Sequence, residues 1–187
     1  MTLQLTEACP RDAALLHGIT QAAFAEYSGQ FNPPFACLSE TLDDVHAALV
    51  AGGALFAWID GDAVGAARYS AQSGTLHISR VAVLPAWRGC GVASALMNAL
   101  EQRGWELGCD ILSLTTRLTL PRNVALYERC GFQVVERWQC APAADVQVRM
   151  TKPLSRHLSP QHHLRAESES QVSRDRSAVR QGSLWTA

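Results

Sequence analysis

The sequence has no surplus of positive charge and contains a single lysine, Lys152. Its 16 lysine and arginine residues are balanced by 17 aspartate and glutamate residues, which gives a formal net charge of −1. Binding to nucleic acid or to an anionic membrane surface needs a basic face. The composition therefore argues against a nucleic-acid or membrane partner and favours a small molecule or a protein.

Long apolar segments are also missing. No stretch approaches the roughly 20 apolar residues that a membrane-spanning helix needs. Residues 1–10 have neither a positively charged leader nor a continuous apolar run, so they are not typical of a signal peptide. We therefore expect a cytoplasmic protein without a membrane segment.

Closely spaced cysteines are missing as well. The six cysteines form no C-x-x-C pair and no cluster with histidine: Cys9, Cys37, Cys90, Cys109, Cys130 and Cys140. A zinc site needs closely spaced ligands, so we expect no metal, and free thiols in a reducing compartment. The pair His162-His163 alone supplies too few ligands for a tetrahedral site.

A shift in composition divides the chain near Leu154. Apolar residues make up 48% and charged residues 18% of the chain, which is typical of a globular protein. Residues 155–187 are rich in Ser, Arg, Gln, His and Glu and show no apolar period. Such a segment cannot bury enough surface to offset the entropy of ordering it. We predict one domain over 1–154 and a disordered tail over 155–187, with a short docking helix at 179–185 as the alternative.

Hydrophobic periodicity predicts the elements of the domain. In chain order they are a strand at 2–7, a helix at 11–27, a loop at 28–38, a helix from 39 or 41 to 51, strands at 54–59, 63–70 and 76–84, a helix ending near 107, a strand around 111–114, a short helix at 123–129, and strands at 132–139 and 146–151. Thr41-Leu-Asp-Asp44 resembles a capping box, and Asp60-Gly61-Asp62 is a hairpin signal. The order predicts an α/β (α+β) fold containing an antiparallel meander.

The stretch VAVLPAWRGCGVAS at 81–94 is the most informative for chemistry. A strand runs into a glycine-bearing turn, and a helix begins at once. The first amides of a helix lie unpaired at the positive end of its dipole, so an anion such as a pyrophosphate can bind there. Gly89 and Gly91 allow the backbone to approach phosphates, and Arg88 adds positive charge.

One other interpretation of this loop stays open, and two are excluded. Two glycines before a helix also occur as ordinary turn chemistry. A Walker-type site is excluded because no Gly-Lys-Ser/Thr follows the loop. A dinucleotide-binding fold is excluded because the sequence lacks the third small residue and the later acidic residue of that motif.

The loop resembles motif A of the GNAT superfamily of N-acetyltransferases, Arg/Gln-x-x-Gly-x-Gly/Ala, which is complete here as RGCGVA at 88–93. A second family signature, an Asn at a short helix with Leu-Tyr and then Gly-Phe, is present as NVALYERCGF at 123–132. Two motifs in the right order are more specific than either alone. The resemblance covers about residues 3–154.

The resemblance implies a fold and a cosubstrate site. The fold is a mixed, mostly antiparallel central sheet of about seven strands with helices on both faces. The strand at 80–83 looks like the family's bulged fourth strand, which splays from the fifth and binds the pantetheine arm of acetyl-CoA by strand addition. The amides of 89–94 would hold the pyrophosphate. The implied contacts are Val81, Ala82, Val83, Arg88, Gly89, Cys90, Gly91, Val92, Ala93, Ser94 and Asn123.

The resemblance also implies a mechanism in which Tyr127 is the general acid. A primary amine of a small molecule or peptide attacks the acetyl thioester directly, with a backbone N–H near Val83 as the oxyanion donor. The ordinary pKa of tyrosine, about 10, is close enough to the roughly 8.5 of a thiol for the proton to be shared in the transition state. A buried core tyrosine is the alternative interpretation.

The sequence does not identify the general base. Four residues are candidates: Glu26, Glu40, His77 and Ser79. Only His77 has a matched ordinary pKa. Strand alternation places Ile78 and Arg80 on one face, and His77, Ser79 and Val81 on the other. His77 is thus better interpreted as an ordinary residue of the sheet, and in some family members ordered water takes the proton.

The acceptor site is expected between the loop at 28–38 and the last strand pair. Tyr27, Phe31, Pro34 and Phe35 are the candidate contacts. The loop has no excess of carboxylates, which favours a modest amine or an amino-acid-like acceptor over a polycation. Alternatively, Phe31 and Phe35 only pack the loop down. The resemblance also implies a possible homodimer.

Two other functional classes stay open. One is a non-catalytic acyl-CoA-binding regulatory module that has kept motif A, and the other is an interaction protein that works through residues 155–187. Tyr127 and the complete motif favour the enzyme over the regulatory module. If the chain were such an interaction protein, deleting residues 155–187 would abolish partner binding.

Overall fold

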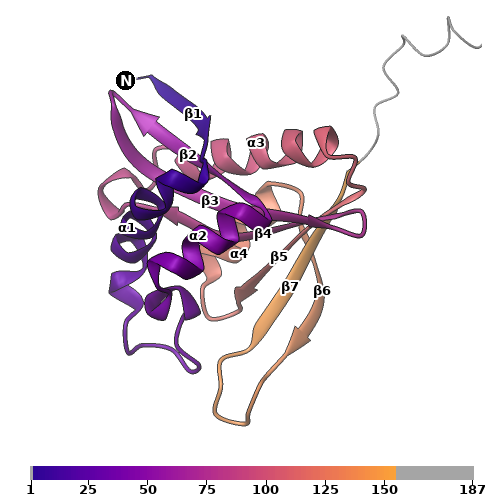
Figure 1. Ribbon diagram of the computed structural model, residues 1–187. Helices are drawn as coiled ribbons and strands as arrows, with labels where there is room; N and C mark the ends of the chain where they lie inside the picture. The colour runs from indigo at the N-terminus through magenta and orange to yellow at the C-terminus, as the bar shows by residue number, and fades with distance from the viewer. Residues whose placement is uncertain (1, 155–187) are drawn as a thin grey trace, which may run out of the picture. The chain divides into compact units, whose positions relative to one another are not determined.

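The computed structural model describes residues 2–154 (Figure 1). The predictions for the disordered tail, for the docking helix at 179–185 and for His162-His163 fall on residues 155–187, which lie outside the described residues.

The described part has the predicted order of elements. Its strands are β1 Leu3–Glu7, β2 Gly53–Ile59, β3 Asp62–Gln72, β4 Thr75–Val83, β5 Ile111–Arg117, β6 Gln133–Trp138 and β7 Gln147–Pro153. Its α-helices are α1 Ala13–Phe24, α2 Leu42–Ala51, α3 Val92–Glu106 and α4 Pro121–Arg129. Short 3-10 turns are η1 Pro10–Asp12, η2 Ala25–Tyr27, η3 Ala36–Ser39 and η4 Pro85–Trp87.

The strands form one seven-stranded sheet in the order β1-β2-β3-β4-β5-β7-β6. Neighbouring strands are antiparallel except for β4 and β5, which are parallel. The hairpins on either side of β3 turn at Asp60-Gly61, with φ of 52° and 95°, and at Ser73-Gly74, with φ of 49° and 74°. Two consecutive left-handed residues match the twist of the flanking strands. The predicted mixed, mostly antiparallel sheet is confirmed.

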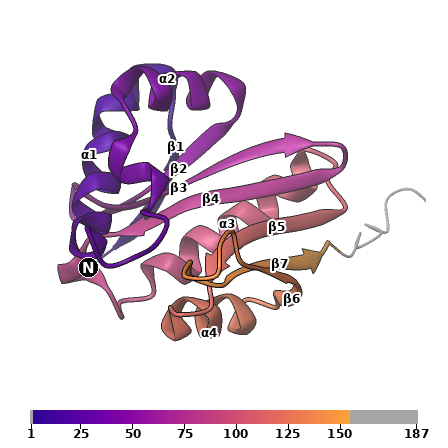
Figure 2. The same cartoon turned by 90° about the horizontal axis from the view of Figure 1, so that it is seen from below.

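Helices cover both faces of this sheet, as predicted. Figure 2 shows α1 and α2 on one side and α3 and α4 on the other. We call these sides the α1/α2 face and the α3/α4 face. Leu16 of α1, Val45 of α2 and Phe56 of β2 belong to the core of the first face, and Leu96 of α3 and Tyr127 of α4 to the larger core of the second.

Local sequence signals account for the start of α2. Thr41 Oγ1 accepts a hydrogen bond from Asp44 N at 3.2 Å, and Thr41 N donates to Asp44 Oδ2 at 2.8 Å. This is the predicted capping box, which satisfies amides that the helix itself cannot.

The cysteines are all free thiols, as expected. Within residues 2–154, no three histidine, cysteine, aspartate or glutamate side chains are grouped to hold a metal ion. No helix of the same region is long and apolar enough to cross a membrane.

The alternation predicted for β4 is wrong beyond Ser79, because β4 contains a bulge. The register with β3 shifts between Ala66 and Arg68, so Arg80 and Val81 oppose the single residue Ala67. Arg80 adopts a left-handed φ of 52°. The extra residue puts Arg80 on the α1/α2 face beside Ser79, and Val81 packs against the core of the α3/α4 face.

Candidate active site

The strands β4 and β5 are paired over only part of their length. They are paired from Thr75 and Ile111 to Ile78 and Leu114. Beyond that point β4 continues to Val83 and β5 to Arg117, but within the described residues these two strands no longer pair with each other. The segment from the bulge to Val83 therefore has a backbone edge without a strand partner. This edge holds the predicted positions Val81, Ala82 and Val83, and an extended chain can add to such an edge.

The loop after β4 leads to an uncapped helix. Gly89 and Gly91 have φ of 81° and 82°, and a Cβ on either would meet no other atom within 4 Å. Gly91 is the N-cap of α3 and provides no side-chain cap. The first amides of α3, which begins at Val92, therefore lack a capping side chain, and the space beside both glycines is open, so an anion can bind there. Cys90 lies in the turn before α3, and Ala93 and Ser94 lie in the first turn of the helix.

Arg88, which the sequence analysis placed at the cosubstrate site, is bound by other groups of the protein. Its guanidinium forms an ion pair with Glu26. It also donates to Ala23 O at 3.0 Å and to Val83 O at 3.3 Å. The side chain thus joins the end of α1 to the end of β4, and its charge is partly neutralised by Glu26.

A close contact that the sequence analysis missed fixes α3 against the sheet. A Cβ on Gly65 would lie 2.9 Å from Ala82 O and 3.0 Å from Val92 Cγ1. Only glycine therefore lets β3 approach both β4 and the start of α3. The signal was a glycine inside an apolar strand, which often marks such an approach.

Tyr127 lies buried in α4, one helical turn after Asn123. The two side chains share a face of the helix because they are four residues apart. The Tyr127 ring packs edge-on against Phe132, with centroids 6.2 Å apart. Burial raises the pKa of Tyr127 well above its ordinary value, and Cys130 and Tyr27 raise it further. Its hydroxyl stays protonated, but the ordinary pKa assumed from the sequence does not apply in this site.

The aromatic residues of the predicted acceptor loop pack on one another. The Phe35 ring is 5.3 Å from Phe24, 5.5 Å from Tyr27 and 5.2 Å from Phe31, between centroids. These contacts support the packing interpretation for Phe31 and Phe35. Pro34 is exposed on the same loop.

An ion pair that the sequence analysis missed fixes this loop to the loop between β6 and β7. Arg117, at the end of β5, donates to Asp145 Oδ2 at 2.8 Å and also to Pro33 O. Asn32 N donates to the same Asp145 oxygen at 2.9 Å. The Arg117 guanidinium lies over the Phe35 ring at 4.4 Å from its centroid. A nearly buried arginine of this kind needs such partners, but nothing in the sequence identifies them.

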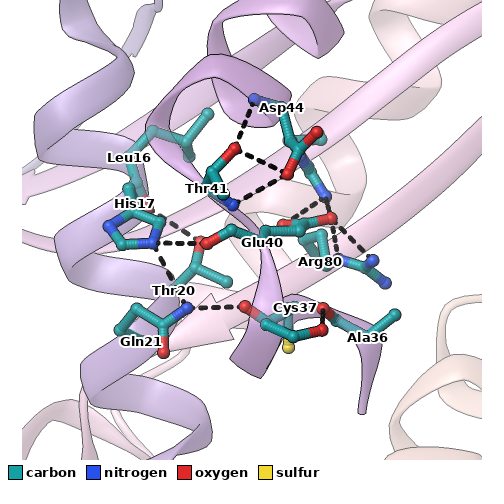
Figure 3. A network of polar contacts seen from close by, with 12 residues as sticks. Leu16, His17, Thr20, Gln21, Ala36, Cys37, Glu40, Thr41, Asp44 and Arg80 are labelled. Carbon is teal, nitrogen blue, oxygen red and sulfur yellow. Dashed lines mark hydrogen bonds and ion pairs between the residues drawn. The ribbon is translucent and has the colours of Figure 1, made fainter.

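Glu40 forms a second cluster on the α1/α2 face (Figure 3). Its Oε1 accepts from Arg68 Nη2 and from Arg80 Nη2, both at 2.7 Å. Its main chain is held by α1 through the contact between His17 Nε2 and Glu40 O that Figure 3 marks, in which the two atoms are 3.0 Å apart. Burial raises the pKa of Glu40, but the bonds from Arg80 and Arg68 outweigh it, so the pKa lies below its ordinary value.

The four candidate bases are in different environments. Glu26 is paired with Arg88, and Glu40 with two arginines. The pKa of Glu40 is lowered by its two arginines, so this carboxylate is a poor proton acceptor. His77 and Ser79 are exposed on the α1/α2 face of β4.

Comparisons with known proteins give a consistent result. The family model described as "Acetyltransferase (GNAT) family" matches residues 20–132. The "Uncharacterized N-acetyltransferase YjgM" of Escherichia coli (strain K12) is 25% identical over 152 residues, which cover 77% of this chain and 90% of that protein.

Solved structures share the fold. The ribosomal-protein-S18-alanine N-acetyltransferase of Escherichia coli superposes with a TM-score of 0.68 and 17% identity, over 84% of this chain and 99% of that one. The yncA protein of Salmonella typhimurium, a putative acetyltransferase solved with its cofactor acetyl-CoA, superposes with a TM-score of 0.68 and 19% identity, over 86% and 98% of the two chains.

Proposed function

The chain belongs to the acetyltransferase (GNAT) family, and we propose that it moves an acetyl group from acetyl-CoA to a primary amine of a small molecule or peptide by direct attack. Acyl transfer is the general reaction that membership in the family supports. The cosubstrate, the nitrogen acceptor and the residues below are the finer parts of the proposal.

The single observation that carries the proposal is the continuity of two backbone features. The edge of β4 at Val81–Val83 that β5 does not pair leads through η4 and the glycine-bearing loop to the uncapped start of α3. A pantetheine arm resembles a peptide and can add to the strand edge, and a pyrophosphate suits the helix N-terminus. Acetyl-CoA has these two parts in one molecule. Asn123 would contact the pantetheine from α4.

Two groups would then act on the thioester: a backbone amide on the carbonyl oxygen and Tyr127 on the sulfur. When the amine attacks, negative charge develops on the carbonyl oxygen, and the N–H near Val83 would stabilise it. As the tetrahedral intermediate collapses, the C–S bond breaks and the sulfur needs a proton. Tyr127 keeps its proton because burial raises its pKa, so it has one to donate.

The attacking nitrogen must lose a proton, and we propose that water accepts it. The two carboxylate candidates, Glu26 and Glu40, are occupied by arginines. The acceptor would approach between the aromatic loop and the α1/α2 face of the sheet. Tyr27, Phe31, Pro34 and Phe35 are its proposed contacts, with Phe31 and Phe35 held in place by their neighbours.

Three broader expectations belong to the same proposal. Residues 1–154 would form the catalytic domain, the protein would act in the cytoplasm, and it would have the capacity to form a homodimer. The experiment below tests the chemistry independently of these.

Calorimetric titration with acetyl-CoA and with CoA tests the cosubstrate, and thiol release on a panel of amines tests turnover. We expect binding of both ligands and turnover that is lost in Tyr127→Phe. Binding without turnover on any amine would favour the regulatory module. No binding would contradict the assignment of the loop at 88–94.

A further inference from the structure

Within residues 2–154, a row of polar residues crosses the α1/α2 face of the sheet from β3 to β6. Ser70, His77, Ser113, Thr151 and Gln133 lie opposite one another in register on β3, β4, β5, β7 and β6. Directly opposite residues share a face. This row borders the point where β4 and β5 separate. A polar acceptor is better suited to such a surface than an apolar one.

Two carboxylates on or beside this face are already paired with arginines. Glu136 lies 2.6 Å from Arg149, and Asp145 lies 2.8 Å from Arg117. These are one-to-one pairs with no net charge. A protonated amine or a lysine-rich peptide would therefore compete with an arginine for each of these carboxylates.

The cluster of Glu40 with Arg68 and Arg80 has a surplus positive charge instead. One carboxylate serves two guanidiniums at 2.7 Å each. The lowered pKa of Glu40 keeps it ionised, so two positive charges face one negative charge. The cluster as a whole attracts an anion.

Arg80 is the accessible member of the cluster. Its side chain is 25% exposed, compared with 10% for Arg68. Its Nε and Nη2 both bind Glu40 Oε1, at 3.2 and 2.7 Å, which leaves Nη1 for a ligand. A guanidinium fixed in this way loses little further freedom when it binds a carboxylate.

We propose that the acceptor carries a carboxylate close to its amine, as an amino acid does, and that Arg80 binds this carboxylate. The inference rests on the proposed function and narrows its substrate class. Arg80 directly precedes Val81, where the edge proposed for the pantetheine arm begins. A carboxylate on Arg80 therefore brings an adjacent α-amine near the thioester. Glu40 is a positioning residue that orients the guanidinium.

The first test compares matched acceptors on the wild-type protein. Each amino acid of a panel is assayed beside its carboxamide and its decarboxylated amine, by kcat/KM for thiol release. A charge-assisted hydrogen bond predicts a preference of about 10-fold or more for the acid. Equal values for acid and carboxamide would overturn the inference.

The second test compares Arg80→Gln with Arg80→Lys. We expect Arg80→Gln to raise KM for the acid about 10-fold or more, with no change for the carboxamide, and Arg80→Lys to recover part of the loss. The control is Arg103→Gln, which removes an arginine of α3 paired with Glu7 and Glu106. An equal loss for acid and carboxamide in Arg80→Gln would mean that the cluster only stabilises the fold.

A binding measurement separates this inference from the proposed function. Amino acids and their carboxamides are titrated calorimetrically into the protein, with and without CoA. Acid-selective binding that Arg80→Gln abolishes, without any turnover, would support the carboxylate site and contradict the transferase. Turnover of amines without preference for the acid would support the transferase and contradict the carboxylate site.

Discussion

Glu40 and Arg80 meet at the bulge of β4, where Glu40 Oε1 accepts hydrogen bonds from Arg80 Nη2 at 2.7 Å and from Arg80 Nε at 3.2 Å. The same oxygen accepts a bond from Arg68 Nη2 at 2.7 Å. The carboxylate thus links the loop before α2 to both strands of the bulge. Without it, two guanidiniums would face each other.

Glu40→Gln is expected to lower the free energy of unfolding by about 2–3 kcal/mol, because it leaves two partly buried like charges without a counter-ion. Urea unfolding at pH 7 measures the loss. The matched control is Glu136→Gln, which removes an exposed pair with Arg149 and should cost less than about 1 kcal/mol. Equal losses in the two variants would contradict a special role for Glu40.

The stabilising effect of Glu40 should depend on pH in a defined direction. Its pKa is lower in the folded protein than the 4.5 of the free group. The folded state therefore binds the proton less tightly than the unfolded state, and the stabilisation is present above about pH 4.5 and lost as the pH falls below it. The difference between wild type and Glu40→Gln should be constant from pH 6 to 7 and shrink in acid. A constant difference down to pH 3 would contradict the lowered pKa.

Tyr127→Phe should reduce thiol release by about 10²–10⁴-fold while acetyl-CoA binding is unchanged, because only the proton donor is removed. Tyr69→Phe, which removes a hydroxyl of β3 that bonds Glu7 at 3.3 Å, is the control and should keep full activity. An equal effect of both changes would argue for a structural role of Tyr127.

The raised pKa of Tyr127 also predicts an effect in alkali. The folded state holds this proton more tightly than the unfolded state, so the stabilisation is complete below the ordinary pKa of about 10 and is lost as the pH rises above it. Urea unfolding from pH 8 to 11 should show a steeper fall for wild type than for Tyr127→Phe. Parallel curves would contradict the raised pKa.

Gly91→Ala and Gly18→Ala are the same chemical change in two backbone environments. Gly91 has a φ of 82° at the start of α3, so alanine should cost about 1–2 kcal/mol of stability and weaken CoA binding. Gly18 lies inside α1 with no atom within 4 Å of a Cβ, so alanine should stabilise by about 0.5–1 kcal/mol and leave CoA binding unchanged. Unchanged CoA affinity in Gly91→Ala would contradict a pyrophosphate site there.

Asp145→Asn should release the loop at 28–38 from the β6–β7 loop. The change removes the charge that holds Arg117 and weakens the acceptor for Asn32 N. Hydrogen exchange should become faster in both loops, with the Asp60-Gly61 turn as an internal reference. KM for the acceptor should rise more than KM for acetyl-CoA. If acetyl-CoA were affected more, these loops would not border the acceptor.

The sequence by itself determined the features that depend on local interactions. The elements and their order follow from periodicity, the α2 start from the Thr41 capping box, and the hairpin between β2 and β3 from Asp60-Gly61. The glycine-bearing loop was visible because Gly89 and Gly91, which both adopt positive φ, lie directly before the start of α3. All of these rest on residues within a few positions of one another.

The tertiary structure alone decided the features that join distant segments. The bulge that turns Arg80 to the face of Ser79 depends on the register with β3, which no periodicity within β4 reveals. Asp145 reaches Arg117 across 28 residues, and Glu40 reaches Arg80 across 40. Glu40 could therefore be named from the sequence as a candidate base, but not as the counter-ion of two arginines. A charge shows its role only when folding brings its partners within hydrogen-bonding distance.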